Sequence, residues 1–138
     1  YKIAKEIPFF SKVQKYIDEK WQEYKRNNFV VSDIYNRKIG KNIRFTNKSK
    51  LFNYCIQLLE TENNMKVLDD LLPILEGKKT KIVLYSYDSF LFDFHKEDGI
   101  DFVKKIKQTI EQNKTYPVKV AWGKNYHKIQ DITEKFND

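Results

Sequence analysis

Apolar residues recur at helical spacing near the start of the chain. Between residues 9 and 26 they stand three or four positions apart, with lysines and acids between them. The set is Phe9, Phe10, Val13, Ile17, Trp21 and Tyr24. This spacing predicts an amphipathic helix, with Pro8 in its first turn and the pair Asn27-Asn28 at its end.

Two later stretches show the same periodicity, residues 48–76 and residues 98–112. In the longer stretch the apolar face runs from Leu51 to Leu75, and Gly77 marks its end. We expect a break at residues 61–64, where the polar run Thr-Glu-Asn-Asn interrupts the pattern, giving either two helices or one bent helix. In the shorter stretch isoleucines and a valine form the inner face.

Shorter stretches that are rich in β-branched and aromatic residues predict strands. They are residues 29–39 as one hairpin, 81–86 with 90–95 as a second hairpin, and 117–122 as a last strand, while the tail 126–136 suits one or two helical turns. This order predicts an α+β fold, with long helices packed on a small antiparallel sheet. The final strand, strand, helix and strand resemble half of a ferredoxin-like unit.

The second predicted hairpin, KIVLYSYDSFLFDFHK at residues 81–96, is the most apolar part of the chain and has Asp88 at its centre. Both faces of its strands are apolar, so we expect both faces to be covered. Asp88 and Ser89 suit a tight turn, where their side chains bond the local backbone. The same turn would hold a carboxylate fixed and accessible, as a Mg²⁺ ligand must be. Asp93, the second acid of the run, could be a second ligand, but we expect it to point outward into solvent.

The basic residues are unevenly distributed. The net charge is +7, and eight basic residues lie between positions 24 and 50, where only Asp33 opposes them. The eight are Lys25, Arg26, Arg37, Lys38, Lys41, Arg44, Lys48 and Lys50. The remaining sequence holds 26 − 8 = 18 basic and 19 − 1 = 18 acidic residues, so the whole excess lies in this basic cluster. Such clustering indicates contact with a phosphate backbone, although a solvated lysine-rich loop has the same composition.

Other residues limit the possible classes of function. No apolar run is long enough to cross a bilayer, so no membrane partner is expected. Cys55 is the only cysteine, which excludes an intrachain disulfide and a cysteine zinc site and favours a reducing, cytoplasmic setting. Asn53 and Gln57 stand four apart in the long helix, so their amides would project from one face. They could read base edges in a groove or could be ordinary exposed positions.

Four segments occur in an order that resembles the C-terminal palm of a family A DNA polymerase of the phage or virus type. They are FVVSDIYNRKI, LFNYCIQ, IVLYSYDSFLFDF and YPVKVAWGKNY. The family has a Gly-Arg-Arg-like turn, an Asn-x-x-x-Gln helix, a His-Asp-Glu hairpin and a Gly-x-Asn-Trp segment in this order. The matching positions here are Asn36-Arg37-Lys38, Asn53 with Gln57, Tyr87-Asp88-Ser89 and Gly123-Lys124-Asn125-Tyr126. The resemblance runs from about Ile7 to Lys128.

The resemblance implies that residues 1–138 are a single palm-subdomain segment of a longer polymerase, which adds nucleotides to a primer 3′ end by a two-metal mechanism. Asp88 would bind the Mg²⁺ pair, Tyr87 would lie near the primer terminus, and Asn53 with Gln57 would face the minor groove. The DNA backbone would be held by Arg37, Lys38, Lys41, Arg44, Lys48 and Lys50. The implied partners are primer-template DNA, a dNTP and the remaining fingers, thumb and N-terminal palm segments, in the host cytoplasm if the protein is viral.

Two departures from the family pattern limit what this chain could do. Tyr87 replaces the histidine, and Ser89 replaces the acid that follows the catalytic aspartate. One metal ligand therefore remains, and we expect the chain alone to be inactive. A reverse-transcriptase-like palm is a second hypothesis, which Ser89 disfavours because such hairpins carry two adjacent acids. A non-catalytic nucleic-acid-binding module, with Tyr85, Tyr87 or Phe92 stacking on bases, is a third. The last hypothesis is a structural or protein-interaction role.

Overall fold

The computed structural model describes residues 8–40, 44, 47–112 and 114–136, and it confirms the α+β class. The chain divides into two compact units, Tyr1–Asn63 and Asn64–Asp138, which are described separately below. The prediction of a single palm segment stays a prediction, because it concerns function as well as shape. None of the helices in the described ranges combines the length and the apolar character needed to cross a membrane.

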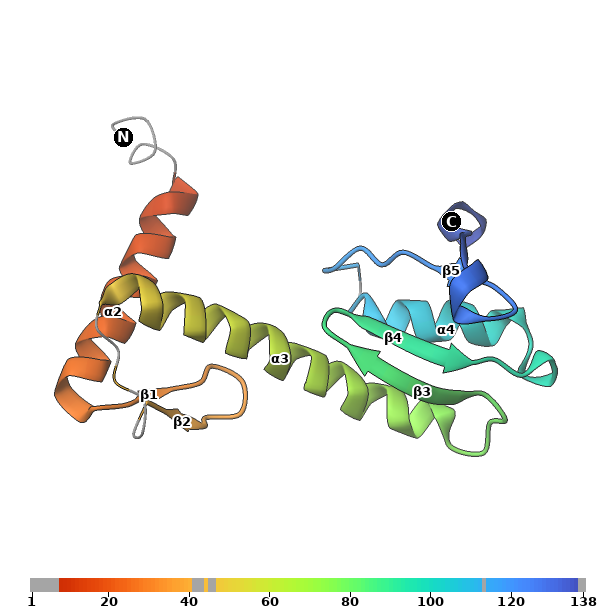
Figure 1. Ribbon diagram of the computed structural model, residues 1–138, viewed down its shortest axis with the longest axis horizontal. Helices are drawn as coiled ribbons and strands as arrows, with labels where there is room; N and C mark the ends of the chain where they lie inside the picture. The colour runs from red at the N-terminus through yellow and green to blue at the C-terminus, as the bar shows by residue number, and fades with distance from the viewer. Residues whose placement is uncertain (1–7, 41–43, 45–46, 113, 137–138) are drawn as a thin grey trace. The chain divides into compact units, whose positions relative to one another are not determined.

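Unit 1 contains helix α2 (Pro8–Asn27), the hairpin of β1 (Val30–Val31) and β2 (Lys38–Ile39), and the first part of helix α3 (Lys48–Leu75) (Figure 1). The predicted first helix and first hairpin are both confirmed, with Val30 paired to Ile39 in antiparallel register. Asn28 has a φ of 60°, and its N–H donates to the Tyr24 carbonyl at 2.8 Å, which ends α2.

The core of unit 1 is small. Val30, Leu51 and Cys55 are buried, and Trp21, Tyr24 and Ile39 pack against them. These residues come from α2, the hairpin and α3, so the periodic apolar positions meet as their spacing predicts. The core places one face of α3 against the hairpin and leaves Asn53 and Gln57 exposed.

Helix α3 is one continuous helix of 28 residues, so the expectation of two separate helices divided at residues 61–64 is wrong. The polar run contains neither proline nor glycine, and nothing in it stops the backbone hydrogen bonds. Two of its side chains, Glu62 and Asn64, instead make the contacts described below. The predicted end of the helix is confirmed, because Gly77 has a φ of 74° and the Lys78 N–H donates to the Leu75 carbonyl at 3.0 Å.

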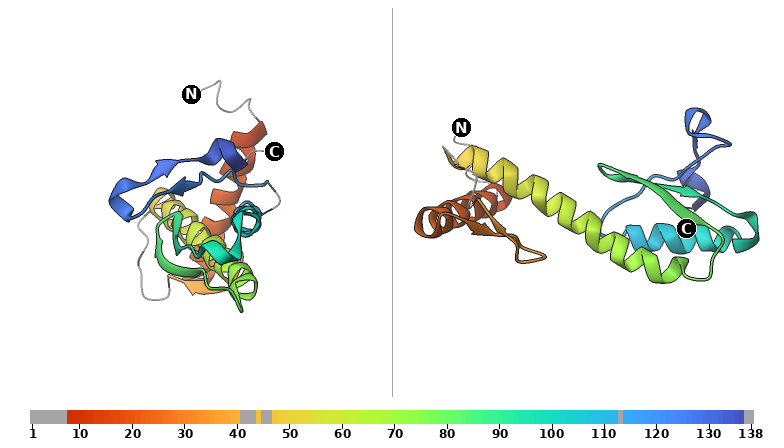
Figure 2. Two further views of the ribbon diagram at one scale, coloured as in Figure 1. Left: turned by 90° about the vertical axis from the view of Figure 1, so that its right-hand side faces the viewer. Right: turned by 60° about the horizontal axis from the view of Figure 1, so that its bottom comes forward.

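Unit 2 contains the hairpin of β3 (Lys81–Ser86) and β4 (Ser89–Asp93), the short turn η1 (Lys96–Asp98) and helix α4 (Ile100–Ile110). Figure 2 shows the last part of α3 and α4 lying together beneath this hairpin. The core cluster is formed by Val67, Leu71, Leu75, Phe102 and Ile106, with Ile74, Ile82, Phe90, Phe92 and Ile110 packed on it. The second hairpin and the third helix are therefore confirmed, with α4 shorter than predicted.

A β-bulge changes which residues share a face of this hairpin. Ile82 pairs with Phe92 and Leu84 with Leu91, so Val83 is an extra residue on β3. Ile82 and Tyr85 then lie on the core face, although they are three positions apart. Strict alternation over this stretch could not have predicted that arrangement.

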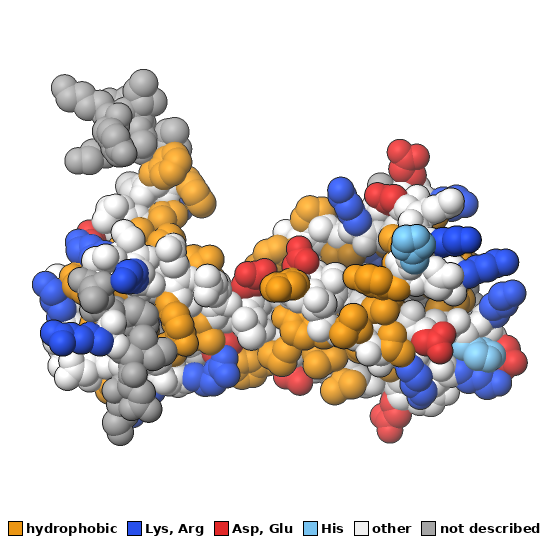
Figure 3. All heavy atoms as spheres, in the orientation of Figure 1, with side chains coloured by type: hydrophobic (Ala, Val, Ile, Leu, Met, Phe, Trp, Pro, Cys, Tyr) orange, Lys and Arg blue, Asp and Glu red, His pale blue; other side chains and the backbone are white. Residues whose placement is uncertain are grey.

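The expectation that both faces of this hairpin are covered is wrong. Val83 and Leu84 remain 56% and 47% exposed, while Phe90 and Phe92 are only partly exposed on the core face. Figure 3 shows hydrophobic side chains at the surface over this part of unit 2. Asp93 is exposed, as expected for a solvated residue.

The predicted last strand at residues 117–122 is largely wrong. Only β5 (Ala121–Trp122) forms, and it pairs with β6 (Gln130–Asp131) rather than with the β3–β4 hairpin. Among the described residues that hairpin is a two-stranded sheet, so the half-ferredoxin arrangement is absent there. The tail does contain the two predicted helical turns, η2 (Tyr126–Lys128) and η3 (Thr133–Phe136).

Candidate functional site

Asp88 lies in a two-residue turn at the tip of the β3–β4 hairpin. Ser86 and Ser89 form the last pair of the ladder, and Tyr87 and Asp88 connect them. Tyr87 has a φ of 52°, the left-handed conformation that the first position of a tight hairpin turn requires. Both turn residues are exposed. The prediction that Asp88 occupies a tight turn is confirmed, and this residue is exposed to solvent. Ser89 was also expected in the turn, but it is the first residue of β4 and pairs with Ser86.

The turn is fixed by a residue that the sequence analysis missed. The Asn64 side-chain amide donates to the Tyr87 carbonyl at 3.1 Å and to the Tyr85 hydroxyl at 3.1 Å. Tyr85 stacks on Phe90 with ring centroids 5.2 Å apart, and the Ser89 hydroxyl donates to the Ser86 carbonyl at 2.9 Å. Asn64 was visible in the sequence only as part of the supposed break. The turn that carries Asp88 is therefore fixed by the Asn64 hydrogen bonds from α3, by the stacking of Tyr85 on Phe90 in the sheet, and by the local bond between Ser89 and Ser86.

A groove of about 630 Å³ is lined by Asp88 and by residues of β4, α4 and the segment 117–122. Its walls are mostly apolar and aromatic, and they include Trp122. Lys107 and Lys119 are its cations, and Lys107 is already paired with Glu111 at 2.7 Å. The volume lies in the range of ligand sites, roughly 300–1,000 Å³.

The described residues do not make a complete magnesium site. Among the residues that the structure describes, Asp88 is the only acid that lines the groove. No group of three or more His, Cys, Asp or Glu side chains gathers anywhere in the part of the chain that the structure describes. A two-metal centre needs several carboxylate oxygens around both ions. The donor set here therefore does not fit a magnesium pair by itself.

The described residues of the basic cluster are exposed, and several of them have partners within unit 1. The Lys48 ammonium pairs with Asp18 at 2.5 Å, and Lys38 lies over the Phe29 ring at 5.0 Å. Arg44 and Lys50 are exposed on the segments before and within α3. Lys41 lies outside the described residues. The cluster thus presents cations to solvent, but some of these cations already interact with other side chains of unit 1.

Among the described residues of the basic cluster, Arg37 contributes most to the structure of unit 1. Its Nε donates to the Glu62 carboxylate at 2.9 Å, although 55% of the Arg37 side chain is exposed. Glu62 is fully buried, and it also accepts from the backbone N–H groups of Ile34 and Tyr35 at 3.3 and 3.2 Å. Burial alone would raise the pKa of Glu62, but hydrogen bonds from Ser32, Arg37 and the two backbone groups lower it below 4.5.

Glu62 therefore holds the loop between β1 and β2. Ser32, at the other end of this loop, accepts from the Arg37 N–H at 2.8 Å. The sequence analysis did not identify Glu62, because a carboxylate in a polar run of a helix is normally exposed. Only its position, one helical turn after Leu58 on the apolar face, could have indicated burial.

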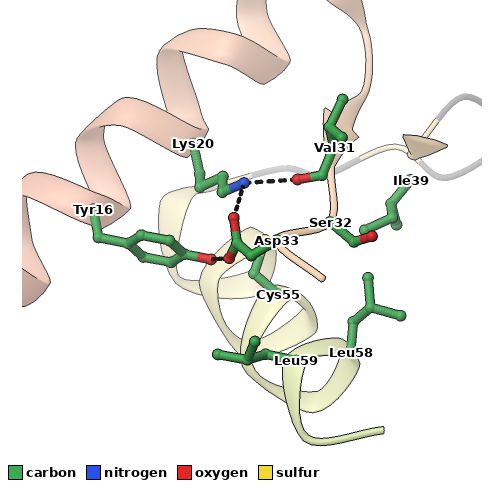
Figure 4. Close-up of a pocket in the computed structure, with 9 residues that line it drawn as sticks. All are labelled: Tyr16, Lys20, Val31, Ser32, Asp33, Ile39, Cys55, Leu58 and Leu59. Atoms are coloured by element: carbon green, nitrogen blue, oxygen red, sulfur yellow. Dashed lines mark hydrogen bonds and ion pairs between the residues drawn. The ribbon is translucent and has the colours of Figure 1, made fainter. Parts of the chain in front are cut away.

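Asp33, the one acid in the sequence between positions 24 and 50, also has hydrogen-bonding partners within unit 1 (Figure 4). It accepts from the Tyr16 hydroxyl at 2.6 Å and from the Lys20 ammonium at 2.7 Å, and Lys20 donates further to the Val31 carbonyl at 2.6 Å. Burial and then the bond to Asp33 raise the pKa of Tyr16 well above its usual value. Since Lys20 lies outside the basic cluster, Asp33 offsets little of the cluster's charge.

The space among these groups is too small for a ligand. Side chains of Cys55, Leu58 and Leu59 close it on the α3 side, and about 10 Å³ remains (Figure 4). That is about the space of a single water probe. This network stabilises unit 1 and does not form a binding pocket.

Asn53 and Gln57 are both exposed on α3, one helical turn apart. They share unit 1 with the basic cluster, whereas Tyr87 and Asp88 belong to unit 2. Each unit thus carries part of the predicted site.

Comparison with protein-family models, with curated proteins and with solved structures finds no match to this chain. The resemblance to family A polymerases rests on the four segments and their order alone.

Proposed function

We propose that this chain is part of a template-directed DNA polymerase of the family A type and supplies its Asp88-bearing hairpin. The observation that carries the proposal is the exposed Asp88 carboxylate on a turn fixed by Asn64, next to a groove lined by apolar and aromatic residues. The enzyme would extend a primer 3′ end with dNTPs, in the cytoplasm. The order of the four segments supports this assignment.

In this proposal the residues of unit 1 contact primer-template DNA. Lys38, Arg44 and Lys50 present exposed cations, and Asn53 with Gln57 present exposed amides. Arg37 and Lys48 contribute less free charge, because each already forms an ion pair. The contacts to phosphate would be salt-dependent, as backbone contacts are.

Asp88 would act with carboxylates from the fingers, thumb or N-terminal palm segments of the same enzyme. When bound, Mg²⁺ would neutralise charge on the transferring phosphate. This chain has one suitable carboxylate, so we expect no nucleotide addition by residues 1–138 alone.

Primer extension by the longer polypeptide that the proposal requires is the test. Asp88→Asn should abolish nucleotide addition, while binding of primer-template DNA, measured by anisotropy, stays close to that of the unchanged protein. Asp93→Asn is the matched control, since Asp93 is exposed on the same hairpin at the end opposite the turn. Near-normal extension by Asp88→Asn, or equal loss in both variants, would refute the assignment.

A non-catalytic nucleic-acid-binding module is the second candidate. It is favoured by Tyr87, which is 88% exposed beside Asp88, whereas Tyr85 and Phe92 are partly buried and poorly placed for stacking. Such a module would bind DNA equally well with Mg²⁺ and with EDTA, and it would have no extension activity in any longer form.

A further inference from the structure

Residues 121–131, here called the ribbon, are ordered yet almost entirely exposed. They comprise β5, η2 and β6, and every residue from 121 to 130 is classed as exposed. Large apolar side chains are among them: Trp122 is 41% exposed, Tyr126 69% and Ile129 37%. An ordered segment that keeps such side chains in solvent is typical of an interaction surface.

The ribbon is fixed by hydrogen bonds within it and between the residues that flank its two ends. The Lys128 N–H donates to the Asn125 side-chain oxygen at 3.1 Å, and the Val120 N–H donates to the Thr133 hydroxyl at 2.8 Å. Gly123 packs so closely on Lys128 that a Cβ there would lie 2.1 Å from the Lys128 carbonyl oxygen. A surface that is already ordered loses little conformational entropy when it binds.

The charge of this region is strongly one-sided. Residues 114–128 contain four lysines, Lys114, Lys119, Lys124 and Lys128, and no acid. Among the residues that the structure describes, none of these four forms an ion pair. Figure 3 shows Lys and Arg side chains projecting from the surface of unit 2. Arg37 and Lys48 of the basic cluster, in contrast, are both paired.

Asp131, the first acid after this run, does not cancel its charge. The carboxylate accepts from the Thr133 hydroxyl at 2.6 Å and from the Thr133 N–H at 2.9 Å. These bonds from Thr133, more than the charge of Lys119, lower the pKa of Asp131. Asp131 therefore serves the ribbon's own structure, and the lysines remain free to meet an outside anion.

Exposed aromatic side chains are the second feature of this surface, beside the lysines. The Trp122 ring meets Phe94 edge to face, with centroids 5.0 Å apart at 63°, so the indole has a fixed orientation while part of it stays in solvent. Tyr126 lies four residues further on, in η2, next to His127 and Lys128. Lysines interleaved with exposed aromatic rings match a polyanion whose bases can stack.

We propose that the ribbon, together with the adjoining Lys119, binds single-stranded nucleic acid, with Lys119, Lys124 and Lys128 along the backbone and Trp122 and Tyr126 stacked on unpaired bases. The phosphates of a duplex could also pair with the lysines, but its bases are stacked on one another and could not stack on Trp122 or Tyr126. The ribbon also presents no helix that could enter a major groove. This inference does not rest on the proposed polymerase function, because it requires neither Asp88 nor a metal ion.

The test uses the 138-residue chain in EDTA and a fluorescein-labelled oligothymidylate of about 16 nucleotides, the upper end of typical site sizes. Anisotropy titrations over a salt series measure the affinity. Tyr126→Ala should weaken binding by about 5-fold to about 100-fold, the usual effect of losing one stacked base. The double variant Lys124→Gln with Lys128→Gln should reduce the slope of log affinity against log salt by about 1.4, about 0.7 for each contact.

Matched controls lie in the same unit. Lys96→Gln with Lys105→Gln removes two other exposed lysines. These two control substitutions should leave the affinity and the salt slope unchanged. Asp88→Asn should also bind normally, which separates this proposal from the fate of the polymerase assignment.

The outcomes are distinguishable. In NMR spectra the Trp122 indole N–H signal should shift on addition of the oligonucleotide, and a duplex of the same length should bind more weakly. Unchanged affinity in Tyr126→Ala, or an equal loss in the controls, would overturn the proposal. Binding to vesicles of anionic lipid without binding to the oligonucleotide would overturn it as well and would assign the ribbon to a membrane surface.

Discussion

Replacing Glu62 with glutamine should destabilise unit 1 without changing its volume. In the native unit one carboxylate oxygen accepts from Arg37, and the other accepts from the backbone N–H groups of Ile34 and Tyr35. Glutamine has one acceptor oxygen and one NH₂ group. In either orientation of the amide, a donor would therefore face a donor inside a fully buried site.

The size of the stability loss depends on which hydrogen-bond donor loses its acceptor. The glutamine oxygen should turn to the two buried backbone groups, because Arg37 is 55% exposed and can reach water. The variant then loses one charge-assisted hydrogen bond, which costs about 1.5–3 kcal/mol. Glu62→Ala leaves all the donors without their acceptor and should cost more, about 3–5 kcal/mol.

The pH dependence provides a second signature. The native pKa of Glu62 lies below its ordinary value of 4.5, so its stabilising contribution is present above that pH. The contribution is lost as the pH falls through the native pKa. Stability of the glutamine variant should therefore fall less between neutral and acidic pH than that of the unchanged chain.

Urea denaturation measured at neutral and acidic pH is the assay for both effects. Amide hydrogen exchange at Ile34 and Tyr35, the two donors to Glu62, localises the loss. Glu60→Gln is the control, because Glu60 is exposed on the same helix two residues earlier. A Glu62→Gln variant as stable as the control, with the two amides still protected, would refute the assigned role of this carboxylate.

Two further predictions concern unit 2. Asp98 accepts from the Thr80 hydroxyl at 2.6 Å and the Thr80 N–H at 2.7 Å, and these bonds lower its pKa below 3.8. Asp98→Asn should thus lower the melting temperature at neutral pH and have less effect at acid pH; an effect independent of pH would contradict this reasoning. Gly123→Ala would force residue 123 away from Lys128 and open the ribbon at a cost of about 1–3 kcal/mol. Faster exchange of the Lys128 amide would show the opening, and unchanged exchange would disprove it.

The helices and the hairpins were predictable because each buries one regular stripe of apolar residues. The positions that pack into the unit 1 core, such as Trp21, Leu51 and Cys55, are among those that the spacing identified. The α+β class followed from the order of these elements. Asp88 was placed correctly in its turn because apolar, strand-like stretches flank it on both sides, although Ser89 proved to be the first residue of β4 and not part of the turn.

The failures have specific physical causes. The polar run at residues 61–64 interrupts the apolar pattern because Glu62 and Asn64 hydrogen-bond to loop backbone, and such tertiary contacts leave no periodic signal. The bulge at Val83 shifts the alternation of β3 by one residue, so the exposed face was misjudged. Residues 117–120 alternate like a strand, but Val120 bonds to Thr133 and Ile132 instead of to β4.

Cys55 has a consequence for how the two units can be studied. It is 6% exposed in the core of unit 1, burial raises the pKa of its thiol, and the chain has no other cysteine. A thiol reagent can react rapidly with Cys55 only after unit 1 opens, since the reactive thiolate is suppressed in the folded unit. The labelling rate, divided by the rate for the denatured chain, therefore measures the opening equilibrium of unit 1 within the uncut and untagged chain.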